Sequence, residues 1–421
     1  MLERIGVASV DALFDDIPAQ VRNPALTLPP PLSEPELARE MAQMAARNLS
    51  VAEMPCFLGA GAYRHFIPSV VDYVIRQGAF ATAYTPYQPE ISQGTLQSIF
   101  EFQSLVCELT AMDVANAGMY DGASALAEAC LVAVRITGRQ RLALLSTINP
   151  TYQRVVRTYA EGHALPVDVM EPDAAALSED HACLVVQQPN FFGYLEDVAA
   201  LEKRAHDAGA LYVVVPEAMS MGMLKPPGEY GADIVVAEGQ PLGIPLSFGG
   251  PYVGLFATRQ KHIRQMPGRL VGRTTDVDGR TGYVLTLQTR EQHIRRERAT
   301  SNICTNEQLA ALAATVYLCA LGKRGLRQVA ELCYHKAHYA AEKIAALPGY
   351  SLPLPGTFFQ EFVVRCPRPP RAVNAALLER GIIGGLDVSE QMEGGMLLCV
   401  TEMNSREEID GLVEALREIG A

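Results

Sequence analysis

Residues 232–254 read ADIVVAEGQPLGIPLSFGGPYVG, and this stretch decides how the chain is interpreted. The apolar run 234–237 predicts a buried strand, and a loop that contains Gln240 and Pro241 follows it. A Gly-Gly-Pro turn then leads into a second predicted strand, residues 252–258. The loop contains no lysine, so it offers no primary amine from which a Schiff base could form.

Strands and helices alternate around this stretch, from about residue 66 to residue 322. The patterns that predict them are helical at 68–77, 93–110, 122–137, 150–161 and 197–207, and strand-like at 142–145, 182–187, 210–215, 233–237 and 253–257. Several of these strands are apolar on both faces, which indicates a sheet covered by helices on both sides. We therefore predict an α/β large domain with a doubly wound, mostly parallel sheet.

Two further regions flank the predicted large domain. Residues 1–65 read as an N-terminal arm with one helix, which Ser33 and Glu36 open as a capping box after a Pro-rich segment. Such an arm cannot build its own core, so we expect it to pack on another surface. Residues 323–421 continue a helix and then alternate strand, helix, strand and helix, which predicts a small α+β C-terminal domain.

The composition is that of a soluble globular protein, with 49% apolar and 19% charged residues among 421. A net charge of −12 argues against nucleic acid or an anionic membrane as a partner. We expect no membrane span, because no apolar run reaches about 18 residues, and no secretory signal at the acidic N-terminus. The nine cysteines stand singly, without a CxxC pair, which favours reduced thiols in a cytoplasmic compartment over disulfides or a zinc site.

Several motifs are absent from the sequence. It contains no Walker phosphate loop, no GxGxxG after a strand, no HExxH and no GxSxG, and we expect no metal site. His65 is the histidine nearest to the loops discussed below, and we interpret it as structural. The chain has six lysines, all after residue 200 and none in the loop at 239–251, and we interpret each as a surface residue: Lys203, Lys225, Lys261, Lys323, Lys336 and Lys343.

Three segments could carry chemistry. Residues 119–128, MYDGASALAE, open a helix with small residues, which is either an anion cup or an ordinary turn capped by Asp121. Residues 84–94, YTPYQPEISQG, form a stiff loop that presents Tyr84, Thr85 and Tyr87.

The third segment, residues 264–302, is rich in arginine and ends in Thr300, Ser301 and Asn302 before a helix. A basic run is usually a solvated face, but arginines beside a helix entry also suit a phosphate or a carboxylate.

Long motifs in the chain resemble one family. They are FLGAGAYRHFIP (57–68), ATAYTPYQPEISQGTLQ (81–97), MYDGASALAEA (119–129), residues 232–254 and residues 268–309. Together they are similar to the P-protein of the glycine cleavage system, and specifically to its N-terminal half, which some organisms make as a separate alpha subunit. The resemblance implies a fold of the pyridoxal-phosphate (PLP) dependent transferase type, fold type I, in the large domain.

The resemblance also implies a division of labour between two chains. The family decarboxylates glycine on PLP and passes the aminomethyl group to the lipoyl arm of H-protein, and the PLP lysine lies in the beta subunit. Gln240 and Pro241 stand where that lysine is expected, and Pro216 or Glu217 stands where a strand-end aspartate would hold the pyridine nitrogen. We therefore expect an alpha subunit without covalent PLP, in an α2β2 assembly, and inactive alone.

The resemblance gives the candidate site residues a role in the partner's active site. A threonine just before the helix that leads to the small domain reaches the neighbouring subunit's phosphate in several fold-type I dimers, so Thr300, Ser301 and Asn302 are assigned to that phosphate. Tyr84, Thr85 and Tyr87 are assigned to the approach of glycine and the lipoyl arm. Two alternatives remain: a non-catalytic scaffold or regulatory protein that kept the fold, and a free-standing enzyme with noncovalent PLP.

Overall fold

The computed structural model describes residues 1–86, 88–299, 301–303 and 307–420. The helices are α1 (Leu2–Ile5), α2 (Glu34–Ala45), α3 (Ser69–Ile75), α4 (Gly78–Ala81), α5 (Gln93–Thr110), α6 (Gly122–Thr137), α7 (Pro150–Gly162), α8 (Val198–Asp207), α9 (Gln292–Arg295), α10 (Gln308–Ala345), α11 (Pro370–Glu379) and α12 (Arg406–Gly420). The strands are β1 (Val114–Ala115), β2 (Arg141–Leu145), β3 (Val167–Met170), β4 (His181–Gln188), β5 (Leu211–Pro216), β6 (Ile234–Glu238), β7 (Gly254–Thr258), β8 (Leu270–Thr275), β9 (Thr281–Thr286), β10 (Glu361–Arg365), β11 (Leu386–Asp387) and β12 (Gly395–Cys399). Contacts divide the chain into two units, residues 1–53 and 54–421.

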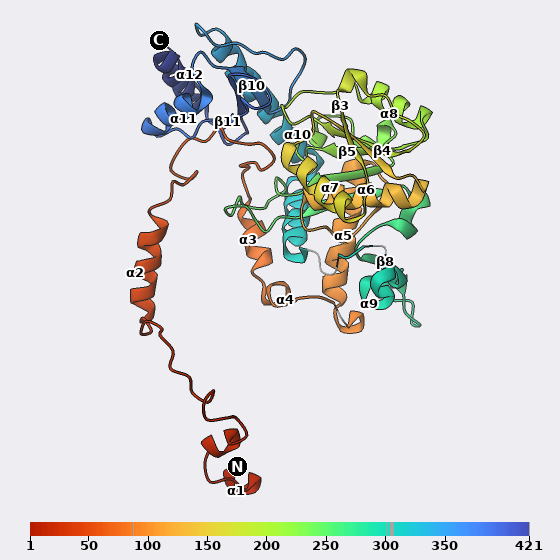
Figure 1. Ribbon diagram of the computed structural model, residues 1–421, viewed down its shortest axis with the longest axis vertical. Helices are drawn as coiled ribbons and strands as arrows, with labels where there is room; N and C mark the ends of the chain where they lie inside the picture. The colour runs from red at the N-terminus through yellow and green to blue at the C-terminus, as the bar shows by residue number, and fades with distance from the viewer. Residues whose placement is uncertain (87, 300, 304–306, 421) are drawn as a thin grey trace. The chain divides into compact units, whose positions relative to one another are not determined.

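Residues 1–53 contain α1, α2 and a short 3-10 turn between them (Figure 1). The capping box is confirmed: the backbone N–H of Ser33 donates to the Glu36 carboxylate, and so does the Ser33 hydroxyl. All 53 residues are described, and none of them is buried. Residues 54–65, which we expected to belong to the arm, belong to the second unit, where Phe57 is fully buried and pairs with Ile383 and Cys399 through backbone hydrogen bonds.

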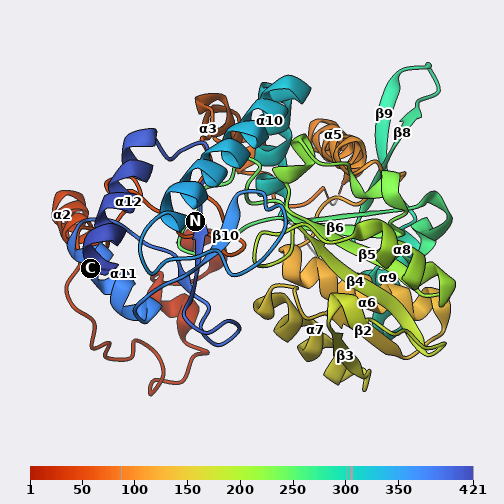
Figure 2. The ribbon, with the colours of Figure 1, turned by 90° about the horizontal axis from the view of Figure 1, so that it is seen from above.

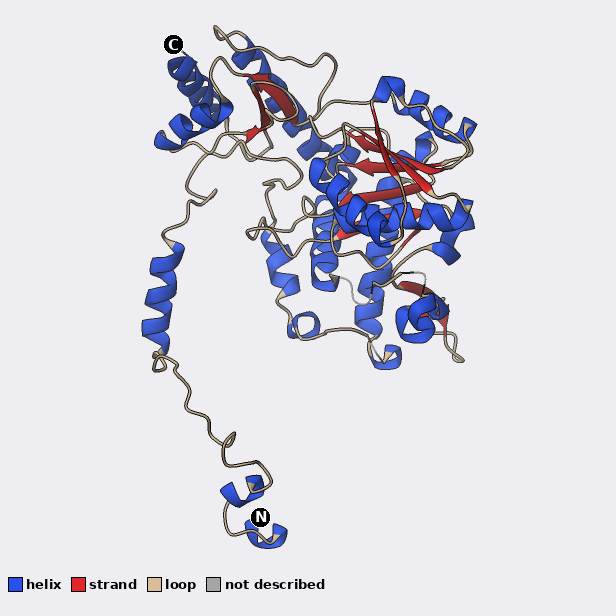
Figure 3. Cartoon of the chain, viewed as in Figure 1, coloured by secondary structure: helices blue, strands red, loops and turns tan. Residues whose placement is uncertain are grey.

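A seven-stranded sheet forms the centre of the second unit (Figure 3). Its strand order is β1-β7-β6-β5-β4-β2-β3, and the five strands from β6 to β3 pair in parallel. The strands β7 and β1 pair antiparallel at the other edge. Helix α6 packs against β4 to β7, α8 packs against β4 and β5, and α5 packs against β1 and β7. The predicted α/β, mostly parallel architecture is confirmed.

The small sheet β10-β12-β11 is antiparallel and packs with α11, α12 and the second half of α10 around a separate apolar cluster. Helix α10 extends from the region of α5 to that of α12 (Figure 2). Gly322 interrupts it with φ 58° and ψ −178°, so the two helices expected on either side of this residue meet at a kink. The boundary at 322/323 between a large and a small domain stays a prediction.

Helix α10 bears on the expectation that the chain has no membrane span. By length and composition it is apolar enough to cross a membrane, and 44% of its most apolar stretch is buried inside the protein. Buried alanines from both halves of this helix belong to the two largest core clusters, and a buried core helix meets the same criterion as a membrane span.

Candidate functional site: a small cavity at the sheet edge and two nearby loops

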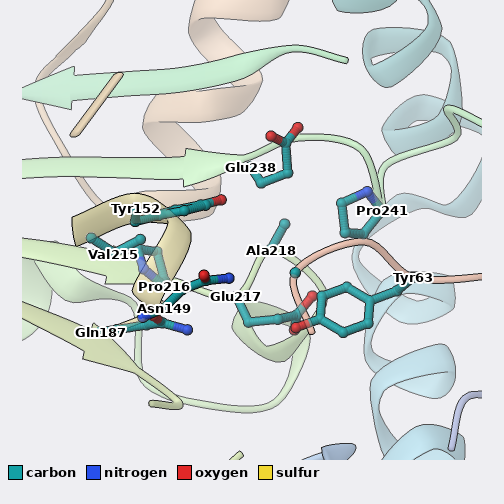
Figure 4. Close-up of a pocket in the computed structure, with 11 residues that line it drawn as sticks. Tyr63, Asn149, Tyr152, Gln187, Val215, Pro216, Glu217, Ala218, Glu238 and Pro241 are labelled. Carbon is teal, nitrogen blue, oxygen red and sulfur yellow. The ribbon is translucent and has the colours of Figure 1, made fainter. Parts of the chain in front are cut away.

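A small cavity lies at the carboxyl edge of the parallel strands, where open α/β sheets place their ligands (Figure 4). Strands β4, β5 and β6 end at it, and the start of α7 covers it. It measures about 30 Å³ and is lined by Gly61, Tyr63, Asn149, Tyr152, Gln187, Val215, Pro216, Glu217, Ala218, Glu238 and Pro241. Pro216 and Glu217, one of which stands where a strand-end aspartate is expected, both line this cavity.

Gln240 stands at the expected lysine position and has a structural role. Its side chain is 1% exposed. Its Oε1 accepts from the backbone N–H of Tyr63 at 2.8 Å, and its Nε2 donates to the Tyr63 carbonyl at 2.9 Å and to the Ile244 carbonyl at 2.8 Å. The amide therefore ties the loop after β6 to segment 57–65, and it uses its hydrogen-bonding capacity in doing so.

Glu238, at the end of β6, occupies the start of α6. Its Oε2 accepts from the backbone N–H of Gly122 at 2.9 Å, and its Oε1 accepts from that of Gln240 at 3.0 Å. Burial raises the pKa of this carboxyl to about 7, although these backbone amides act in the opposite direction. The start of α6 is where a fold-type I enzyme is expected to place the phosphate of PLP.

Two more carboxyls lie nearby: Glu217, which is half-buried and lines the cavity, and Glu361, which is buried and bonded to Tyr63. Glu217 accepts from the backbone N–H groups of Met219 and Ser220, and burial raises its pKa. Glu361 accepts from the Tyr63 hydroxyl at 2.7 Å and from the backbone N–H of Ala60 at 2.6 Å. Burial raises the pKa of Glu361 to about 7.

The cavity does not fit PLP. About 30 Å³ accommodates roughly two water molecules, whereas ligand pockets usually exceed about 300 Å³. The expected phosphate position is filled by the Glu238 carboxylate, the expected lysine position by the hydrogen-bonded Gln240, and Pro216 or Glu217 stands at the strand end where an aspartate is expected. The small volume of the cavity also opposes noncovalent binding of PLP.

The loop at 84–94 lies beside a second, larger cavity of about 380 Å³. Tyr84 is 72% exposed, and Thr85 lines the cavity together with Arg269, His293 and Ile303. Tyr87 lies outside the described residues. The Arg269 guanidinium is buried and lies 3.7 Å from the Glu291 carboxylate.

Ser301 and Asn302 line a third cavity of about 560 Å³ between the loop 297–303, α6 and α7. Ile303 lines both this cavity and the one beside Thr85, so the structure brings the two predicted site segments together. Thr300 lies outside the described residues. The placement of Ser301 and Asn302 against a partner's cofactor stays a prediction.

Glu128 and Arg135 face the cavity that contains Ser301. They stand seven residues apart on α6 and therefore share a face of that helix. Glu128 is 6% exposed. Burial raises the pKa of its carboxyl, while a hydrogen bond with the Ser301 hydroxyl and the charge of Arg135 lower it. Glu128 Oε2 and Arg135 Nε are buried and have no hydrogen-bond partner among the described residues. Each group has other partners: Glu128 interacts with the Ser301 hydroxyl and the Arg135 charge, and Arg135 donates to the Gln265 carbonyl.

Two features of the sequence prove to be structural. Asp121 caps α6 by accepting from the backbone N–H of Ser124 at 2.7 Å, so the capped-turn interpretation of residues 119–128 is confirmed. Arg290, from the arginine-rich run, is buried and donates to the carbonyls of Met266, Leu287 and Gly268. This arginine holds a turn together and is not available to a phosphate.

His65 is also engaged structurally. Its Nδ1 lies 2.7 Å from the Glu402 carboxylate, whose second oxygen accepts from the backbone N–H of Phe66. Cys333 Sγ donates to the same carboxylate at 3.4 Å. These three side chains are close enough to hold a metal ion, but the contacts among them account for their clustering.

The sequence did not single out Glu238, Tyr63 or Glu361. Glu238 lies within the motif at 232–254, but its role depends on how close the start of α6 comes to it. Glu361 could have been noticed as an isolated charge in the apolar strand β10, since an acid is rarely fully buried.

This sheet order, with the cavity at its carboxyl edge, defines the class of PLP-dependent enzymes of fold type I. The chain superposes on a sphingosine-1-phosphate lyase from Burkholderia pseudomallei with a TM-score of 0.64 at 16% identity, covering 96% of this chain and 94% of that one. It superposes on a Lactobacillus brevis glutamate decarboxylase with a TM-score of 0.66 at 14% identity, covering 94% and 95% of the two chains. At these identities the likeness shows the fold alone.

The family is shown by closer matches. Residues 1–416 match the family described as the glycine cleavage system P-protein, and the chain belongs to that family. A crystal structure of glycine decarboxylase (P-protein) of the glycine cleavage system, in inhibitor-bound form, superposes with a TM-score of 0.95 at 45% identity, covering 100% of this chain and 97% of that one.

Two relatives described as subunit 1 confirm that the chain corresponds to the N-terminal half of the P-protein. A probable glycine dehydrogenase (decarboxylating) subunit 1 from Thermomicrobium roseum is 56% identical, over 100% of this chain and 97% of that protein. A protein of the same description from Geobacillus kaustophilus is 53% identical, over 99% and 96%.

Proposed function

We propose that this chain is the non-PLP-binding alpha subunit of glycine decarboxylase. Together with a beta subunit that carries the PLP lysine, it decarboxylates glycine and transfers the aminomethyl group to the lipoyl arm of H-protein. The assembly is an oxidoreductase of the glycine cleavage system, and the alpha chain alone is inactive. Membership of the P-protein family and relatives described as subunit 1 support this proposal.

The single observation that carries the proposal is the closure of the chain's own cofactor site. Gln240 replaces the lysine and is tied to Tyr63, and Glu238 occupies the start of α6. A free-standing enzyme with noncovalent PLP would need a cavity of cofactor size at this place, and the cavity measures about 30 Å³. The chemistry therefore belongs to a second chain.

The proposed contribution of this chain is to complete the partner's site. In this proposal Thr300, Ser301 and Asn302 donate hydrogen bonds to the partner's cofactor phosphate. Tyr84, Thr85 and Tyr87 orient glycine and the lipoyl arm and exclude water from the reacting carbon. PLP on the beta subunit would supply the electron sink that the loss of the carboxyl group requires.

Two features favour this role over that of a scaffold. Thr85 and Ile303 line one cavity, and Ile303 and Ser301 line the next, so polar loops converge where a scaffold has no need of them. Glu128 Oε2 and Arg135 Nε, beside Ser301, are buried atoms without a hydrogen-bond partner among the described residues, and a second chain could supply one.

The proposed assembly is an α2β2 heterotetramer in the cytoplasm, in which residues 1–53 wrap the beta subunit. Leu26 and Leu28 of this unit are each 72% exposed, and none of its residues is buried. Apolar side chains that have no core within this unit are suited to a partner surface.

Co-expression with a candidate beta chain tests the proposal. The two chains should elute together, and glycine decarboxylation with lipoylated H-protein should require both. The isolated alpha chain, reduced with borohydride in the presence of PLP and mapped by peptide mass, should carry no stoichiometric pyridoxyl-lysine on its six lysines. Activity of either chain alone would contradict the proposal.

A further inference from the structure

The start of α6 is closed by acidic side chains of this chain. The Asp121 carboxylate accepts from the backbone N–H of Ser124, and the Glu238 carboxylate accepts from that of Gly122. A helix start offers unpaired N–H groups and a partial positive charge, which bind phosphates in many proteins. Here two of those N–H groups already have anionic partners.

Glu238 is held against the helix by backbone contacts. A Cβ atom on Gly122 would lie 2.8 Å from the backbone nitrogen of Glu238 and 2.5 Å from the Tyr152 hydroxyl. Glycine is therefore required at position 122 for this approach. The Glu238 side chain is anchored at its other oxygen by the N–H of Gln240, so it cannot swing away without losing both bonds.

The charges at this end of α6 oppose a further anion. Asp121 and Glu238 are close enough that the Asp121 charge contributes to raising the pKa of Glu238. A phosphate monoester carries up to two negative charges and would have to displace one carboxylate while facing the other. In its neutral form Glu238 still fills the position and still accepts from Gly122.

We propose that Glu238 is a built-in occupant of the phosphate position and that it excludes phosphate monoesters from this chain. Glu238 is thus a specificity-determining residue that acts by exclusion. It keeps a phosphorylated cofactor out of this chain. The further consequence, that PLP is retained only in the partner's site, rests on the proposed function.

The test measures phosphate binding by the full-length chain. The probes are inorganic phosphate and pyridoxine 5′-phosphate, which has no aldehyde and cannot react with surface lysines; pyridoxine without the phosphate is the comparison. Glu238→Ser removes the carboxylate and leaves a hydroxyl that can accept from Gly122. Glu238→Gln keeps the size and removes the charge, and Glu217→Gln neutralises a carboxyl elsewhere in the cavity as the matched control.

Wild type and Glu217→Gln should show no saturable binding of either phosphate probe by calorimetry. Glu238→Ser should bind inorganic phosphate saturably, at least about tenfold more tightly than the detection limit at which wild type shows no binding. Pyridoxine 5′-phosphate and pyridoxine should stay excluded from Glu238→Ser, because the rest of the cavity remains too small for the ring. Glu238→Gln should remain closed, because its amide fills the same position. If Glu238→Ser does not fold, as judged by circular dichroism, Glu238→Gly serves in its place.

A folded Ser or Gly variant that binds no phosphate would overturn the proposal, as would saturable phosphate binding by wild type at this site. The proposed function is scored separately, from the PLP content and activity of the wild-type complex with its beta chain. Loss of that activity leaves the phosphate measurement unaffected.

Discussion

The side-chain amide of Gln240 pairs with the backbone of Tyr63 at both ends, accepting from its N–H at 2.8 Å and donating to its carbonyl at 2.9 Å. Two segments about 180 residues apart in the sequence are joined by this pair. A lysine could donate to the carbonyl but could not accept from the N–H. The substitution that removes Schiff-base chemistry therefore also supplies a structural bond.

Gln240→Ala should be strongly destabilising. It removes three buried hydrogen bonds and leaves the N–H and carbonyl of Tyr63 without partners, which we expect to cost about 3 kcal/mol or more of unfolding free energy. Urea unfolding of the isolated chain measures this. Gln97→Ala, which removes one exposed hydrogen bond to Glu101, is the matched control and should change stability by less than about 0.5 kcal/mol. Equal effects of the two substitutions would contradict the assigned role of Gln240.

Glu361 should make stability depend on pH. Burial raises its pKa to about 7 from an ordinary value of 4.5, so the folded chain binds more protons than the unfolded chain between these values. The contribution of Glu361 to unfolding free energy therefore falls as pH rises from about 4.5 to about 7. Glu361→Gln keeps groups that can pair with Ala60 and Tyr63 but does not titrate.

The test is to measure the unfolding free energies of wild type and Glu361→Gln from pH 5 to pH 8. The difference between them should shift in favour of the variant with rising pH, by up to about 3 kcal/mol over the window. Glu379→Gln, at an exposed position of α11, should run parallel to wild type. A constant difference between Glu361→Gln and wild type would refute the raised pKa.

The sequence predicted most regular elements because their signals are local. Helix α5 was predicted with its observed ends, and strands β4 to β7 within one or two residues, since apolar runs and caps define them. The hairpin β8–β9 was missed because its arginines and glycines resemble a basic loop. Strand β3 was missed because only one face of this edge strand is apolar enough to signal burial.

The candidate site was predicted less completely than the fold. The absence of a lysine is visible in the sequence, but the closure of the cavity depends on contacts between distant segments, such as Glu238 with Gly122 and Gln240 with Tyr63. The arginine-rich run illustrates the same limit: Arg290 is a buried turn residue, and no local pattern distinguishes it from its exposed neighbours.

Removal of residues 1–53 should weaken assembly with the beta chain but leave the stability of the rest of the chain nearly unchanged. The remaining unit contains all four apolar core clusters found among the described residues, so it should unfold within a few degrees of the full chain. Its association with the beta chain should weaken by at least about tenfold if the arm covers the partner. Thermal unfolding and size-exclusion chromatography with the beta chain are the two measurements. Unchanged assembly would show that the arm has another role.

Thr300 and Tyr87 should affect the complex in different ways. A lost hydrogen bond to a charged group costs about 1.5–3 kcal/mol. Thr300→Val should therefore weaken PLP retention in the αβ complex by roughly ten- to a hundredfold, while assembly stays intact. Tyr87→Ala should lower turnover with little loss of cofactor, because its proposed part is to shield the reacting carbon from water.

Both variants must be scored for assembly and for cofactor content. Ser98→Ala on α5 is the control for Thr300→Val: it removes a hydroxyl that bonds only its own helix, and it should change neither quantity. If Thr300→Val assembles with the beta chain and keeps PLP as tightly as wild type, the loop at 297–303 stabilises this chain and does not reach the partner's cofactor.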